Sequence, residues 1–150
     1  MLKNIGCGEL RKEHIGQSVT LAGWVNRRRD HGGIMFIDLR DRSGLVQVVF
    51  NPEHSPEAHH TADQGRVEWV MQVTGTVTHR PPGTENPNLS TGEVEVAATG
   101  AQILNSSKTP PFYINEDEEV DELVRLRYRY LDLRKPMMQR NIILRHKVVK

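Results

Sequence analysis

The segment from residue 19 to residue 50 alternates apolar and polar side chains in three successive runs, which is typical of β-strands. One parity is apolar throughout and comprises Val19, Leu21 and Val25, then Met35, Ile37 and Leu39, then Val46, Val48 and Phe50. Because successive side chains of a strand point to opposite faces, we expect this parity to face the core. The opposite face of this three-stranded meander is then left for polar side chains and a ligand.

The face opposite the core carries an aromatic ring and an amide. Phe36 lies on the polar parity of the second run and Gln47 on that of the third, and the first run ends in Arg27, Arg28 and Arg29. A ring on which bases stack, an amide that reads a base edge and guanidinium groups that hold phosphates suit a single-stranded nucleic acid. Alternatively, Phe36 packs under a loop and the arginines form a solvated strand end.

The pattern changes after residue 51 and then returns to strands. Residues 52–66 lack strand formers and predict a short helix, with Ser55 as its cap, Pro56 at its first position and its end at Gly65. Two further strands are predicted in 67–80 and 92–104. We expect them to bury Trp69, Met71, Val73 and Val77 and then Val94 and Val96, with Glu93 and Glu95 on the other face. The loop between them is dense in Pro, Gly and Asn.

Three strands, a helix and two strands form the element order of an OB-fold. We therefore predict an all-β domain over residues 1–104, a five-stranded Greek-key barrel with one helix between strands 3 and 4. Such barrels bind oligonucleotides across their second and third strands, where Phe36 and Gln47 lie. Residues 105–134 are predicted to be a linker and a helical hinge, which is helical from Glu118 onward. A further helix is expected from Pro136, and its spacing persists to Lys150 as if the sequence ended inside an element.

Charge is segregated along the chain although the formal net charge is only +1. Residues 1–51 and 125–150 are basic and residues 52–124 are acidic, which favours a basic surface for a polyanion and an acidic hinge. The single cysteine excludes an internal disulfide and a cysteine-based zinc site. No metal-ligand set, nucleophile or phosphate-cradling loop predicts an active site. With no apolar run long enough to span a bilayer, we expect a cytoplasmic protein without membrane contact.

Four sequence segments together closely resemble the amino-terminal part of bacterial aspartyl-tRNA synthetases. They are GWVNRRRDHGGIMFIDLRDRSGLVQVVF at 23–50, TGTV at 74–77, STGEVEV at 90–96 and RLRYRYLDLRKPMMQ at 125–139. The resemblance implies an anticodon-binding OB-fold joined by a hinge to a class II catalytic domain, of which 135–150 would be the start. It also implies that this chain binds tRNA but lacks the active site. The full-length enzyme is expected to be a homodimer that uses ATP and Mg²⁺.

The resemblance also implies roles for individual residues. Phe36 resembles the aromatic that stacks on the central anticodon uridine, and Gln47 the amide that recognises the edge of that base. The other implied anticodon contacts are Arg27, Arg29, Arg80 and Glu95. No catalytic or metal-binding residue is implied in this chain.

Two positions bear on which tRNA is used. His31, before a Gly-Gly pair, and Gly83, in the loop 81–91, are similar to the subclass that aspartylates both tRNA(Asp) and tRNA(Asn). Alternatively, both are ordinary turn residues. The rival interpretation of the whole domain is a general single-stranded nucleic-acid-binding OB module, whose stacking and phosphate contacts tolerate any sequence.

Overall fold

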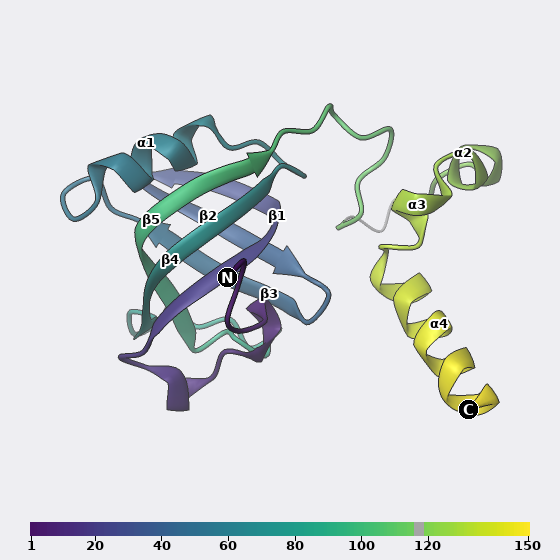
Figure 1. Ribbon diagram of the computed structural model, residues 1–150, viewed down its shortest axis with the longest axis horizontal. Coiled ribbons are helices and arrows are strands. Elements are labelled where there is room, and N and C mark those ends of the chain that lie inside the picture. Colours follow the sequence, from purple (N-terminus) through teal and green to yellow (C-terminus); the bar gives the residue numbers. More distant parts are fainter. Residues whose placement is uncertain (116–118) are drawn as a thin grey trace. The chain divides into compact units, whose positions relative to one another are not determined.

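Five strands of the computed structural model, which describes residues 1–115 and 119–150, close into a barrel in the order β1-β2-β3-β5-β4 (Figure 1). The strands are β1 Ser18–His31, β2 Ile34–Asp41, β3 Gly44–Phe50, β4 Val70–His79 and β5 Val94–Asn105. Neighbouring strands pair antiparallel except β3 and β5, which run parallel. The predicted all-β fold, a five-stranded OB-fold barrel with one helix between β3 and β4, is confirmed.

The core of the barrel is made by the apolar parity of the strands. All of the predicted inward residues of β1, β2 and β3 are buried, and so are Met71, Val73, Val77, Val94 and Val96. Trp69 is the exception, because β4 begins only at Val70 and the chain turns just before it at Glu68, whose φ is 68°. The Trp69 ring is half-buried and its indole N–H donates to the Ser107 carbonyl at 2.9 Å. Its predicted place in the core is therefore wrong.

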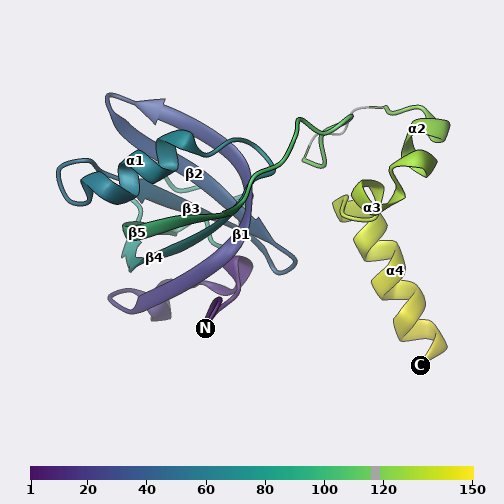
Figure 2. The same ribbon diagram turned by 45° about the horizontal axis from the view of Figure 1, so that its top comes forward.

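Helix α1, Pro56–Gln64, lies against β5 and adds Ala58 and Ala62 to the barrel core (Figures 1 and 2). Its bounds agree with the predicted start at Pro56 and end at Gly65. Ser55 occupies the N-cap position, but its side chain does not cap the helix. Its hydroxyl instead donates to the Thr99 carbonyl on β5 at 3.0 Å. The residue thus fastens the helix start to the sheet.

A β-bulge in β1 decides which face its arginines occupy. Val25 pairs with Leu39, but Arg27 pairs with Asp38, so two residues of β1 span one of β2 and Asn26 is extra. Before the bulge the odd-numbered residues of β1 face the core. After it, Arg27 and Arg29 face the outer side of the meander, in rows with Asp38 and Phe36. The bulge therefore places Arg27 and Arg29 on the face that carries Phe36.

The second unit, Pro110–Lys150, is helical. Its helices are α2 Glu122–Arg127, α3 Arg129–Asp132 and α4 Pro136–Val149, and the short 3₁₀ turns η1 Cys7–Glu9 and η2 Lys12–His14 belong to the first unit. Pro136 opens α4 as predicted. One continuous helix up to Arg134 is not observed, because Tyr128 leaves helical geometry with φ −107° and ψ 43°. The predicted helix start at Glu118 lies outside the described residues.

A buried carboxylate holds the two short helices of this unit together. Asp132 is completely buried and accepts from Arg125 of α2 at 2.9 Å and from Arg129 of α3 at 2.7 Å. Three residues of the same unit form a small apolar cluster, namely Phe112, Ile114 and Leu131. Across the described residues, no helix is both long enough and apolar enough to pass through a membrane.

Candidate nucleic-acid interface

A cleft of about 570 Å³ lies where β1, β2 and β3 meet β5 and the loop that follows β4. Its lining includes every residue that the sequence singled out for anticodon contact or tRNA choice except Arg27, namely Arg29, His31, Phe36, Gln47, Arg80, Gly83 and Glu95. These residues are spread over more than sixty positions of the chain. The fold therefore brings the predicted site together in one place.

The floor of the cleft is apolar. Phe36 on β2 is directly opposite Val49 on β3, and Ile34 lies two residues before Phe36 on the same face. All three side chains are half-buried, so part of each remains open to the cleft. Phe36 was predicted to be part of the site, whereas Val49 and Ile34, which lie on the same face of the sheet, were not. A partly open aromatic ring beside aliphatic groups is a surface on which a base can stack.

A continuous line of hydrogen bonds crosses the sheet beside this floor. Arg29 Nη2 donates to Asp38 Oδ1 at 2.8 Å and to Gln47 Oε1 at 3.2 Å. Gln47 Nε2 donates in turn to Glu95 Oε2 at 2.8 Å. Both ends of the Gln47 amide are thus held by charged neighbours. Asp38 itself does not line the cleft and was not predicted to be part of the site.

Gln47 and Glu95 are nearly buried rather than exposed, with 7% and 9% of their surface accessible. Glu95 was expected to be exposed on the outer face, and that expectation is wrong. The loop after β4 lines the same cleft and helps to bury the side chain. Burial raises the pKa of Glu95, and the hydrogen bond from Gln47 and the charge of Arg80 offset part of that rise. A buried carboxylate and amide supply directional hydrogen bonding next to the stacking floor.

Arg80 is buried against the loop that follows β4, with 6% of its surface accessible. Its Nε donates to the Val94 carbonyl at 3.2 Å and its Nη1 to the Thr84 carbonyl at 3.4 Å. Burial lowers the pKa of Arg80, while the charges of Glu95 and Asp38 act to raise it. Among the described residues, Arg80 Nη2 and Arg29 Nε are buried donors without a partner. Such donors are rare in folded proteins.

The three consecutive arginines of β1 have three different environments. Arg29 lines the cleft, and Arg27 lies on the same outer face but is exposed and outside the cleft lining. Arg28 points to the opposite side, where its guanidinium forms an ion pair with Asp63 of α1 and its Nε contacts the Met35 sulfur. The predicted anticodon contact of Arg27 stays a prediction.

His31 and Gly83 lie at the open end of the cleft. His31 is the exposed last residue of β1, and Gly83 lies in the loop after β4 with φ +86°. Nothing lies within 4 Å of the point where a Gly83 Cβ would be. A larger side chain would therefore find space there but would need a backbone conformation that favours glycine.

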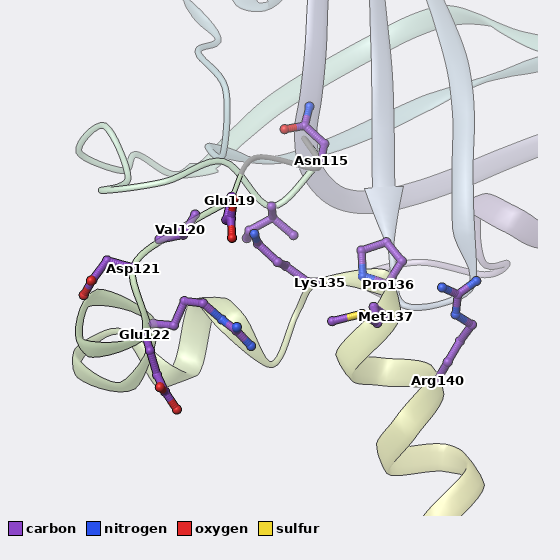
Figure 3. Close-up of a pocket in the computed structure, with 11 residues that line it drawn as sticks. Asn115, Glu119, Val120, Asp121, Glu122, Lys135, Pro136, Met137 and Arg140 are labelled. Carbon is purple, nitrogen blue, oxygen red and sulfur yellow. The ribbon is translucent and has the colours of Figure 1, made fainter.

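A second, wider hollow lies within the second unit, beside the starts of α2 and α4 (Figure 3). Figure 3 shows Asp121 and Glu122 beside the start of α2 and Met137 and Arg140 on α4. It contains none of the residues predicted to bind nucleic acid. In the described part of the chain, no cluster of three His, Cys, Asp or Glu side chains is arranged to hold a metal ion.

A closed five-stranded barrel with a stacking floor and charged donors over β2 and β3 defines a nucleic-acid-binding OB module. In agreement, residues 19–104 match the tRNA anti-codon family model, described as an OB-fold nucleic acid binding domain, and the chain belongs to this family. The match covers β1 to β5 except for the first residue of β1 and the last of β5.

Known proteins similar to this chain include bacterial ligases. It is 62% identical over 149 residues to an aspartate–tRNA(Asp/Asn) ligase of Dehalococcoides mccartyi, covering 99% of this chain and 25% of that protein. The ligase of the same name from Heliobacterium modesticaldum is 62% identical over 143 residues, 95% of this chain and 24% of that protein. The chain thus spans about a quarter of the length of these relatives.

Among solved structures, asparaginyl-tRNA synthetase from Pyrococcus horikoshii, complexed with asparaginyl-adenylate, is similar. The TM-score is 0.75 at 27% identity, with 91% of this chain and 30% of that chain covered.

Proposed function

We propose that this chain is the anticodon-recognition part of a ligase that attaches aspartate to tRNA(Asp) and also to tRNA(Asn). The observation that carries the proposal is the cleft, which combines the Phe36 floor with the buried Gln47–Glu95 pair and two unpaired arginine donors. The names of the relatives support the substrate.

In this proposal a base of the anticodon leaves its stack and lies on the Phe36 ring. The Gln47 amide, held between Arg29 and Glu95, then presents its remaining N–H and carbonyl lone pair to the edge of that base. The guanidinium groups of Arg29 and Arg80, which line the cleft, attract phosphate or carbonyl oxygens of the RNA. Neighbouring side chains thus provide both recognition of the base and attraction for the RNA backbone.

Use of both tRNAs rests on the last anticodon base, which is C in tRNA(Asp) and U in tRNA(Asn). C carries an amino donor where U carries a carbonyl acceptor. A site that demands one of these edges penalises the other by leaving buried groups unpaired. Gly83 has no side chain to make such a demand, and His31 presents a donor or an acceptor according to its tautomer. The pair is therefore expected to accept both bases.

Catalysis is proposed to reside in the remainder of the longer ligase. ATP and Mg²⁺ are its proposed cofactors. We further propose that the full-length ligase is a homodimer and acts in the cytoplasm. The 150-residue chain alone is then expected to bind tRNA without aminoacylating it.

The competing function is a general single-strand-binding OB module. It is tested by displacing a labelled anticodon stem-loop of tRNA(Asp) from the chain with unlabelled, unrelated oligonucleotides of equal length. Because stacking and phosphate contacts tolerate any sequence, a general binder would release the stem-loop to any competitor. We expect only the unlabelled stem-loop itself to compete at low concentration. Equal competition by unrelated strands would contradict the proposal.

A further inference from the structure

Asp38 lies on the outer face of β2, opposite Gln47 on β3, and holds one of the arginines of the cleft. Its carboxylate accepts from Arg29 Nη2 at 2.8 Å, and the same nitrogen donates to Gln47 Oε1 at 3.2 Å. The Asp38 side chain is 19% exposed and that of Arg29 is 39% exposed. Asp38 is not among the residues that line the cleft. Its hydrogen bond to Arg29 is what links Asp38 to the lining of the cleft.

The line of contacts fixes which way round the Gln47 amide lies. Its oxygen faces the Arg29 guanidinium and its nitrogen faces the Glu95 carboxylate. Rotating the amide by half a turn would place N–H groups against the Arg29 donors and the amide oxygen against a carboxylate. Both new contacts are repulsive, so the two charged neighbours together select one orientation. Arg29 can fix the position of the amide oxygen only while Asp38 holds the Arg29 guanidinium in place.

We infer that Asp38 is a positioning residue for base recognition, because it anchors Arg29 and thereby fixes the orientation of the Gln47 amide. The inference rests on the proposed function and deepens it. Without Asp38, Arg29 is free to leave the amide oxygen, and only Glu95 opposes the rotated amide. The chain would then distinguish less well between two bases whose edges differ by exchange of donor and acceptor, such as U and C.

The test compares binding of the 150-residue chain to two anticodon stem-loops that differ only in the middle base, U or C. We expect Asp38→Ala to lower the preference for U about fivefold or more. Asp38→Asn keeps the side-chain volume and one acceptor, and it should lower the preference less. Thermal unfolding of each variant shows that the barrel is intact.

Asp63→Ala is the matched control. Asp63 is also an aspartate paired with an arginine of the same run, but its partner Arg28 lies on the opposite side of the sheet and neither residue lines the cleft. It should leave the preference for U unchanged. In an Arg29→Ala background, Asp38→Ala should produce no further loss, since residues acting through one another are not additive.

The outcomes separate the inference from the function on which it rests. If the unaltered chain prefers U and Asp38→Ala keeps that preference, the role of Asp38 is overturned while the anticodon assignment stands. The role of Asp38 is also overturned if Asp38→Ala weakens binding of both stem-loops equally, or if it lowers the preference for U in the Arg29→Ala background as well. If the unaltered chain binds U and C equally, the proposed function fails, and the positioning role fails with it.

Discussion

Gln47 on β3 donates its side-chain N–H to Glu95 on β5 at 2.8 Å, and both residues are nearly buried. This hydrogen bond lies next to the only parallel strand pair among the described strands. It joins two residues that are 48 positions apart in the chain, both of which line the cleft.

The buried Glu95 carboxylate should make stability depend on pH. Burial raises its pKa in the folded chain above the ordinary value of 4.5. The contribution of Glu95 to stability is therefore complete below that ordinary value and declines as the pH rises through the folded pKa. Relative to the unaltered chain, Glu95→Gln should therefore gain stability as the pH rises above the ordinary value of 4.5, as measured by urea unfolding at a series of pH values. A pH-independent difference between Glu95→Gln and the unaltered chain would contradict this expectation.

Asp41 should have the opposite pH dependence. Burial alone would raise its pKa, but hydrogen bonds from Lys3, Ser43 and the Cys7 N–H together lower the pKa to about 2. The stability that it contributes is present above the ordinary value of 3.8 and is lost as the pH falls through about 2. Asp41→Asn should cost about 1 to 2 kcal/mol at neutral pH and much less near pH 2, allowing for solvent screening. Equal losses at both pH values would show that the carboxylate charge is not the cause.

Phe36 should supply much of the affinity for RNA. Stacking of a base on an aromatic ring is worth about 1 to 3 kcal/mol, so Phe36→Ala should weaken binding of the anticodon stem-loop about tenfold or more. Phe36→Trp keeps a stacking surface and should retain most of the affinity. The measurement is fluorescence anisotropy with the unfolding temperature as a check on folding. Unchanged affinity of a folded Phe36→Ala chain would remove β2 from the binding face.

His31 and Gly83 line the same cleft, so substitutions at either should alter the choice between tRNAs. In the proposed full-length ligase, His31→Leu or Gly83→Lys should lower charging of tRNA(Asn) severalfold more than charging of tRNA(Asp), because each imposes a new demand on the last anticodon base. Gly83→Ala introduces the same backbone strain at φ +86° without a basic group, and it serves as the control. If charging of both tRNAs fell equally, the role of His31 and Gly83 in dual specificity would be contradicted, while the assignment of an anticodon-binding domain would stand.

Alternation along the strands was sufficient to predict the barrel core and to place Phe36 and Gln47 on the outer face, because side-chain direction in a regular strand depends only on parity. It could not predict the bulge at Asn26, since an extra residue reverses parity without any apolar signal. Alternation makes Arg28 and Arg29 point to opposite faces, and the bulge, which was not predicted, decides that Arg29 is the one on the outer face.

Long-range features of the site were also beyond the sequence pattern. The burial of Arg80 and Glu95 depends on where the loop after β4 lies, and loop conformation leaves no periodic trace. The link from Asp38 to Arg29 is diagonal across two strands, so it requires the register of β1 and β2 to be known. The half-buried position of Trp69 similarly depends on a turn at Glu68 that composition does not indicate.

The most direct test of anticodon recognition is the affinity of the 150-residue chain for two stem-loops that differ only in U or C at the middle anticodon position. The held Gln47 amide between Arg29 and Glu95 predicts that the C stem-loop binds about tenfold more weakly or worse, because its edge leaves buried groups unpaired. Equal affinity for the two stem-loops would contradict anticodon recognition by this cleft and would favour a general single-strand-binding module.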